Sequence, residues 1–354
     1  MLFRSVRSNQ YIIGAFLLLP FVLFQYFRKE KIWDILSGVA LYGNLYFIIA
    51  IQTRSVWAAM VLGFIVTGIV FLISGKRRLG IEKRKQLIRK VIYILGAAIL
   101  FFVFAEGLGR IFKNTRSTVT GSIEKTFDSS QKFGAGSRLR RWDATLKLVR
   151  ENPVLGEGAG DWKTVKYKYG LYDNSVTPHN DYLWVMSDSG LVGFFFYILL
   201  FILAFIYLHR AWHKAESEDD RFMALCLLFG LAGYMAIQSF TFPKKGISHQ
   251  VMLTLYFVFA VILNNKTRKE GRINIPQWLF TALLILNILI APVMITFAIV
   301  RLKSEHAERI ALRYRAKGDH KNIIKYMTMA NNKWSNIDPF NHSLASYIAE
   351  SHYY

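Results

Sequence analysis

The chain has 354 residues, of which 53% are hydrophobic and 15% are aromatic, and its apolar residues lie in long unbroken blocks. This arrangement excludes an ordinary soluble domain, in which apolar and polar positions alternate along each surface element. The formal net charge is +22. Because many basic residues lie in short stretches between the apolar blocks, this charge indicates the cytoplasmic loops of a membrane protein and no nucleic-acid partner.

Eight apolar segments each approach the roughly 20 residues that a helix needs to cross a bilayer. They cover residues 11–27, 33–51, 55–75, 88–105, 182–208, 222–240, 250–264 and 277–300. The sequence therefore predicts an all-α integral membrane protein with about eight transmembrane helices.

The short connections predict the orientation of these helices. Residues 76–90 contain eight basic residues and one acidic residue, so we expect this loop in the cytoplasm. Counting spans outward places the basic residues 28–31, 209–214 and 266–272 on the same side. The count also puts residues 1–10, with two arginines, outside, which a chain that begins partway through a larger membrane domain would explain.

This count divides the chain into four segments. Residues 1–105 hold the first four transmembrane helices, and residues 106–181 form a long extracytoplasmic loop. Residues 182–300 hold the last four transmembrane helices, and residues 301–354 form an extracytoplasmic tail. Loops longer than about 60 residues translocate largely regardless of their charge. The basic residues of the long loop are therefore compatible with its extracytoplasmic location.

The tail has a helical pattern of its own. Apolar positions at helical spacing predict one helix over residues 303–317 and a second over residues 320–331, separated by Gly318 and Asp319. Two helices joined by such a turn look like one unit of a tetratricopeptide-type repeat. An amphipathic tail docked on the rest of the protein also explains the pattern.

The long loop contains the most specific patterns in the chain. Ser137 is placed to cap a helix that starts at Arg138 and buries Trp142, Leu146 and Val149. A proline and several glycines then predict an irregular turn with exposed backbone N–H groups. This segment reads Asn152-Pro153-Val154-Leu155-Gly156-Glu157-Gly158, and the loop ends with Pro178-His179-Asn180-Asp181-Tyr182-Leu183.

Arg54 lies in the short outer turn between two apolar spans and is the only charge there. An arginine close to the hydrocarbon region is costly and is therefore a functional candidate. A side chain that extends to the membrane surface from a helix end is the alternative.

Several arginines and a histidine in the outer segments predict phosphate chemistry. Arginine pairs with phosphate oxygens in a bidentate way and remains charged at working pH, so preorganised arginines neutralise a leaving pyrophosphate. A histidine near neutral pH accepts the proton of an attacking sugar hydroxyl. A hard metal cation needs clustered acidic ligands, whereas Glu157, Asp161 and Asp173 are scattered. We therefore expect a site without a metal or a cofactor.

At these residues the chain resembles the O-antigen ligase and polymerase superfamily. The similarity rests on Arg138-Leu139-x-x-Trp142, on Asn152-Pro153-Val154-Leu155-Gly156-x-Gly158 and on His179-Asn180-x-Tyr182-Leu183, and Thr53-Arg54 looks like the family's Ser-Arg turn. It extends over roughly residues 40–265. The resemblance implies a bacterial inner-membrane enzyme that moves a glycan from undecaprenyl pyrophosphate to an acceptor at the periplasmic face, without a metal. Its catalytic loop would be the periplasmic segment 106–181.

The resemblance also implies roles for individual residues. Arg54 and Arg138 would bind the lipid-linked pyrophosphate, and His179 would activate the acceptor hydroxyl. Asn180 would orient His179 or a sugar. Arg141 is a further candidate for substrate binding, because it lies three positions from Arg138 on one helix face, whereas Arg140 is expected in solvent.

His249 is a separate candidate. It lies beside Lys244 and Lys245 in what the sequence predicts as a short external turn. We expect such a basic turn to touch the pyrophosphate or anionic lipid headgroups.

The sequence leaves several functions open. The acceptor of a glycan transferase would be the lipid A core of lipopolysaccharide, another glycan repeat unit, or a protein hydroxyl as in a protein O-oligosaccharyltransferase. A transporter or flippase of polysaccharide precursors, without chemistry, is the alternative of another class. Transporters often contain repeated halves, and this sequence shows no half-to-half repeat.

Overall fold

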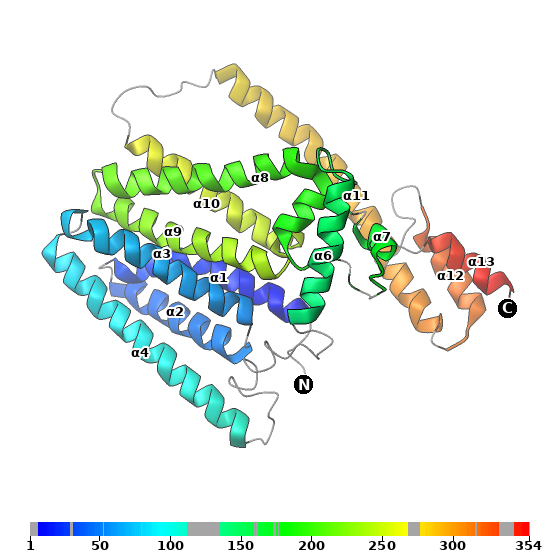
Figure 1. Ribbon diagram of the computed structural model, residues 1–354, viewed down its shortest axis with the longest axis horizontal. Coiled ribbons are helices and arrows are strands. Elements are labelled where there is room, and N and C mark those ends of the chain that lie inside the picture. Colours follow the sequence, from blue (N-terminus) through cyan, green and yellow to red (C-terminus); the bar gives the residue numbers. More distant parts are fainter. Residues whose placement is uncertain are drawn as a thin grey trace. The chain divides into compact units, whose positions relative to one another are not determined.

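A computed structural model describes the protein as a set of helices (Figure 1). The described residues are 6–28, 31–51, 53–78, 80–111, 135–158, 160, 162–172, 175, 177–267, 277–315, 317–332 and 343–353. No β-strand occurs among them, which agrees with the all-α prediction. The chain divides into two compact units, one of residues 1–171 and 177–271 and the other of residues 172–176 and 272–354.

The first unit contains seven long helices and several short ones in its described part. The long helices are α1 (Val6–Phe27), α2 (Lys31–Ile51), α3 (Arg54–Arg78), α4 (Ile81–Ile111), α8 (Asp181–Lys214), α9 (Glu218–Phe240) and α10 (Ile247–Lys266). The shorter elements are α6 (Ala135–Glu151), α7 (Trp162–Val165) and the 3₁₀ turns η1 (Lys166–Tyr169) and η2 (Pro243–Lys245).

Six helices in the described part of the chain are long and apolar enough to cross a membrane. They are α2, α3, α4, α8, α9 and α10, and they correspond to six of the eight expected spans. The protein is therefore a multi-pass membrane protein. The other two expected spans stay predictions: residues 11–27 form a shorter apolar part of α1, and residues 277–300 belong to α11.

Helix α9 is the centre of the first unit, packing against α3, α8 and α1. The contact with α3 is very close because glycines replace side chains there. A Cβ added to Gly233 would lie 2.3 Å from the ring of Phe16 and 2.8 Å from the carbonyl oxygen of Ala59. A Cβ added to Gly63 would lie 2.7 Å from the ring of Phe229. Such small residues let membrane helices approach one another closely.

The acidic first turn of α9 joins three connections of the bundle. The carboxylate of Glu218 accepts a hydrogen bond from the backbone N–H of Gly80 at 3.0 Å. Asp219 lies 3.7 Å from Arg28, and Asp220 lies 2.9 Å from Lys266. Basic connections that the sequence assigned to one side of the membrane therefore lie together at one end of the bundle.

The second unit consists, in its described part, of α11 (Gln277–Arg315), α12 (His320–Ala330) and α13 (Leu344–Tyr353). Helix α11 continues without interruption across residue 300, where the apolar pattern predicts the boundary between a membrane span and the tail. Apolar side chains of the three helices form a small core. Gly318 has a positive φ of 69° between α11 and α12, as the predicted turn requires. A relation to tetratricopeptide repeats stays a prediction.

Candidate functional site

Helix α6 carries two of the candidate arginines. It includes Ala135 and therefore begins earlier than the expected start at Arg138. Its buried face contains Ser137, Arg141, Ala144, Thr145 and Leu148. The predicted burial of Leu146 is wrong, since this side chain is 41% exposed, because the face that α6 buries includes the polar side chain of Arg141. Arg140 is exposed, as expected.

Three candidate arginines come together. Burial lowers the pKa of Arg138, and the positive charges of Arg54 and Arg141 lower it further. Because electrostatic repulsion falls off with distance, this effect indicates that Arg54, at the start of α3, lies close to Arg138 of α6. Arg141 is only 6% exposed. The three guanidinium groups form a cluster of positive charge that suits a multiply charged anion.

His179 lies in the turn that leads into α8. Its φ of 59° is positive, which is uncommon for residues other than glycine. Such strained backbone conformations cluster at functional sites. Its ring lies 4.8 Å from the ring of Phe242 in an edge-to-face arrangement. The indole N–H of Trp142 donates to the carbonyl of Pro178 at 3.1 Å. This bond joins the arginine-bearing helix directly to the residue before His179.

Asn180 has a clear local role. Its side-chain oxygen accepts a hydrogen bond from the backbone N–H of Leu183 at 3.1 Å and so caps the N-terminus of α8. The cap fixes where α8 begins and thereby the position of His179 next to it. Contact of Asn180 with a sugar stays a prediction.

His249 lies elsewhere than the sequence predicted. It belongs to the first turn of α10, and its side chain is fully buried and faces Gly14 of α1. Its Nδ1 lies 3.2 Å from the carbonyl oxygen of Pro243. The expected position in an exposed turn is therefore wrong, because His249 lies on the face of α10 that packs into the bundle, whereas the nearby Ile247 is 83% exposed.

The glycine-rich segment after α6 packs on a break in α8. Gly190 has φ 63° and ψ −167°, which interrupts the helix. The freed backbone N–H groups of Leu191 and Val192 donate to the carbonyls of Pro153 (2.7 Å) and Val154 (3.3 Å). In return, the N–H groups of Glu157 and Gly158 donate to the carbonyls of Ser187 (2.9 Å) and Asp188 (3.1 Å). A broken membrane helix needs such replacement partners for its backbone groups.

The two glycines at this contact have no space for a side chain. A Cβ added to Gly190 would lie 2.1 Å from the carbonyl oxygen of Val154, and one added to Gly156 would lie 2.6 Å from the backbone nitrogen of Gly190. Gly156 of the loop motif therefore shapes the backbone, and its contact with Gly190 fixes the loop on α8.

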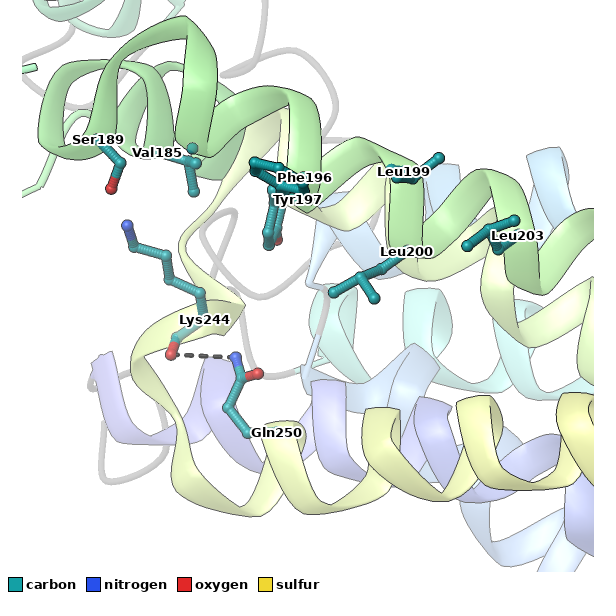
Figure 2. A pocket seen from close by; sticks show the side chains of 10 residues that line it. Val185, Ser189, Phe196, Tyr197, Leu199, Leu200, Leu203, Lys244 and Gln250 are labelled. Atoms are coloured by element: carbon teal, nitrogen blue, oxygen red, sulfur yellow. Dashed lines mark hydrogen bonds between the residues drawn. The ribbon is translucent and has the colours of Figure 1, made fainter. Parts of the chain in front are cut away.

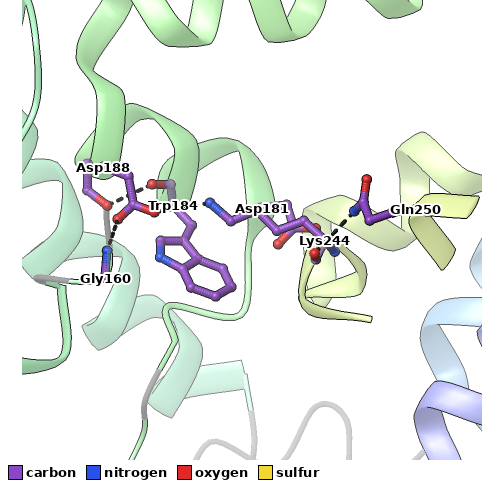
Figure 3. A network of polar contacts seen from close by, with 7 residues as sticks. Gly160, Asp181, Trp184, Asp188, Lys244 and Gln250 are labelled. Carbon is purple, nitrogen blue, oxygen red and sulfur yellow. Dashed lines mark hydrogen bonds and ion pairs between the residues drawn. The ribbon is translucent and has the colours of Figure 1, made fainter. Parts of the chain in front are cut away.

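Sequence reasoning missed a polar network between α8 and the turn before α10 (Figure 3). Its members are Asp181 and Asp188 of α8 and Lys244 of η2. The backbone N–H of Lys244 donates to Asp181 at 2.8 Å, and its ammonium group lies 3.2 Å from Asp188. The sequence signal for this network is the presence of charged residues at the ends of apolar segments. Which of these residues pair depends on the fold.

An apolar groove of about 600 Å³ begins at Lys244 and follows α8 (Figure 2). Its walls include Val185, Phe196, Tyr197 and Leu200, and its polar groups include those of Lys244 and Gln250. A groove with one polar end and a long apolar wall suits an amphiphilic molecule.

No group of three or more His, Cys, Asp or Glu side chains suited to a metal lies among the described residues. Asp161 and Asp173, two of the scattered acidic residues, lie outside the described part of the chain.

Comparisons with known proteins agree with the motifs. Residues 39–198 match the family model described as O-antigen ligase. The chain is 24% identical over 221 residues to a Haemophilus influenzae protein described as uncharacterized, covering 58% of this chain and 53% of that protein. It is 28% identical over 99 residues to an O-antigen ligase of Pseudomonas aeruginosa, covering 28% of this chain and 23% of that protein.

The chain thus spans about half the length of one of these curated relatives and about a quarter of the length of the other. The matched range contains α3, α6 and the turn of His179, and it ends within α8, short of the limit near residue 265 that the motifs suggested. Residues 39–198 of this membrane protein are therefore similar to the O-antigen ligase family.

Proposed function

We propose that the protein transfers a glycan from a polyprenyl-pyrophosphate donor, such as undecaprenyl pyrophosphate, to an acceptor hydroxyl. The proposed setting is the periplasmic face of the bacterial inner membrane. The observation that carries the proposal is the cluster of Arg54, Arg138 and Arg141, linked to His179 through the hydrogen bond from Trp142 to Pro178.

The proposed chemistry follows from these groups. The acceptor oxygen forms a bond to the anomeric carbon while the bond from that carbon to the diphosphate oxygen breaks. His179 takes the proton of the acceptor hydroxyl, and the arginines stabilise the negative charge that develops on the leaving diphosphate. No metal is needed in this scheme, because the guanidinium groups supply the positive charge.

The groove along α8 supports a lipid-linked substrate. Its apolar wall suits an isoprenoid chain, and its polar end at Lys244 lies two residues from Phe242, which contacts His179. A chain bound there would keep its polar end close to the turn of His179.

The broken helix α8 is the feature that a transporter would share, because transporters bind substrate at the free ends of broken helices. Here the backbone groups at the break are paired with the loop of residues 153–158. This pairing favours a structural role for the break and supports transfer chemistry over transport.

The test is a reconstituted assay with purified protein, a lipid-linked oligosaccharide and three acceptors: lipid A core, a second lipid-linked glycan and a serine-containing protein. We expect His179→Ala to retain donor binding and to lower the transfer rate at least about 100-fold. Arg138→Ala should weaken donor binding, whereas Arg140→Ala, an exposed arginine of the same helix, serves as the matched control and should not.

Several outcomes would contradict the proposal. Transfer by His179→Ala and Arg138→Ala at the parent rate would remove both assigned roles. Loss of transfer upon treatment with a chelator would replace the metal-independent scheme. Movement of the donor across the bilayer without a covalent product would identify a transporter.

A further inference from the structure

The turn between α9 and α10 forms one wall beside His179. It contains Phe242, whose ring lies 4.8 Å from the imidazole at an interplanar angle of 79°. The next residue, Pro243, has its carbonyl close to the buried ring of His249. The position of Phe242, and with it the contact on His179, therefore depends on what holds this turn.

Lys244 connects the turn to α8 and α10 through all of its polar groups (Figure 3). Its backbone N–H donates to Asp181 at 2.8 Å, and its carbonyl accepts from the side-chain amide of Gln250 at 3.1 Å. Its ammonium group lies 3.2 Å from a carboxylate oxygen of Asp188 and 4.1 Å from the centre of the Trp184 ring.

These contacts are largely shielded from water. The Asp181 residue is fully buried, and the side chains of Asp188 and Lys244 are 10% and 21% exposed. A pair in such surroundings is screened less than a surface salt bridge, and the loss of one partner leaves the other charge uncompensated. The geometry of the turn is therefore strongly tied to both carboxylates.

The two carboxylates lie on the same face of α8, seven residues and thus two helical turns apart. The first of them, Asp181, is two residues from His179. Helix α8 therefore fixes the backbone of His179, and the same helix fixes, through Lys244, the aromatic ring that the imidazole contacts. The carbonyl of Asp188 also accepts the N–H of Gly158, which joins the glycine-rich loop to this point.

We propose that Lys244, held between Asp181 and Asp188, is a positioning residue that sets the orientation of the His179 imidazole through Phe242. The role of His179 as the general base, which Lys244 would orient, rests on the proposed function. The orientation itself does not, because it is a property of the folded protein before any substrate binds.

The first experiment measures this orientation without an activity assay. The protein is labelled at the ring carbons of histidine, and His179→Gln identifies the His179 resonance in the NMR spectrum. We expect Lys244→Met to shift this resonance and Lys244→Arg, which keeps the charge, to shift it less. Lys245→Met is the matched control, since Lys245 is the exposed neighbour, and should leave the resonance in place.

The second experiment measures transfer kinetics. Lys244→Met should lower kcat about tenfold while the KM for the lipid-linked donor stays within about twofold, the pattern of a lost transition-state interaction. Phe242→Leu, which leaves Lys244 intact, should lower kcat in the same way. If Lys244→Met does not fold, Asp188→Asn removes the other partner of the ion pair and should lower kcat in the same way.

The outcomes are distinct. A folded Lys244→Met protein with an unchanged His179 resonance and unchanged kcat would overturn the proposal. A rise in the donor KM alone would also overturn it and would assign Lys244 to direct substrate contact in the groove. If the parent protein transferred no glycan but the resonance shifted as expected, the proposed function would fail and the positioning role would stand.

Discussion

Arg138 illustrates at the scale of one residue why the guanidinium group matters. Burial and the charges of Arg54 and Arg141 lower its pKa. An arginine remains protonated at physiological pH despite such a shift, because its ordinary pKa is above about 12. Arginine therefore keeps its positive charge at a site where Arg141 is buried and Arg54 and Arg138 are half-buried, which explains the residue type.

The same reasoning predicts a pH dependence for Arg138→Lys. Burial and two neighbouring cations also lower the pKa of an amine at this position, and lysine begins from a lower ordinary value of about 10.4. The charged form is therefore lost as pH rises. We expect the donor affinity of Arg138→Lys to fall between pH 7 and pH 9, while that of the parent falls less.

Donor binding measured by fluorescence or calorimetry at several pH values checks this prediction. Arg140→Lys is the control, since Arg140 is exposed on the same helix and its replacement should keep the parent profile. Identical profiles for Arg138→Lys and the parent would show that Arg138 does not contact the donor.

At the scale of elements, the central feature is the contact between the glycine-rich loop and the break in α8. Gly190 combines a positive φ with a contact that excludes a Cβ. We expect Gly190→Ala to destabilise the protein by about 1–3 kcal/mol through backbone strain, and by more through the clash with Val154. Thermal unfolding of the purified protein measures the combined effect.

Gly170→Ala is the comparison for a positive φ without the contact. Gly170 also has a positive φ, of 72°, but an added Cβ would meet nothing within 4 Å. Its replacement therefore reports the strain of a left-handed residue without a clash. The excess loss in Gly190→Ala reports the contact with the loop together with the greater strain at a ψ of −167°. Equal effects of the two substitutions would show that the loop is not fixed on α8 as described.

The elements also show what the sequence can and cannot predict. Six of the expected spans were confirmed because uninterrupted apolar length alone identifies them. The break at Gly190 was not predicted, since the residues after it continue the apolar run and the break depends on partners in a distant loop. The burial of Arg141 and His249 likewise depends on which helix packs on which, and residue spacing within one helix does not contain this information.

At the scale of the whole molecule, α9 holds the first unit together although it lies beyond the range that matches the O-antigen ligase family. The apolar pattern does not distinguish α9, because its mean hydropathy lies within the range of the other described spans. Its Gly233 meets α3, which starts with Arg54, and its end leads into the turn that contacts His179. The site of the matched domain is therefore supported by a helix outside that domain.

Gly233→Val tests this support directly. Its new Cβ would lie 2.8 Å from the backbone oxygen of Ala59, so α3 and α9 must separate, and overpacking of this kind costs about 1–3 kcal/mol. We expect a lower unfolding temperature and, because Arg54 moves with α3, weaker donor binding. Gly68→Val, at a helical glycine of α3 with open space, is the control. Weaker stability with unchanged donor affinity would show that the position of Arg54 does not depend on α9.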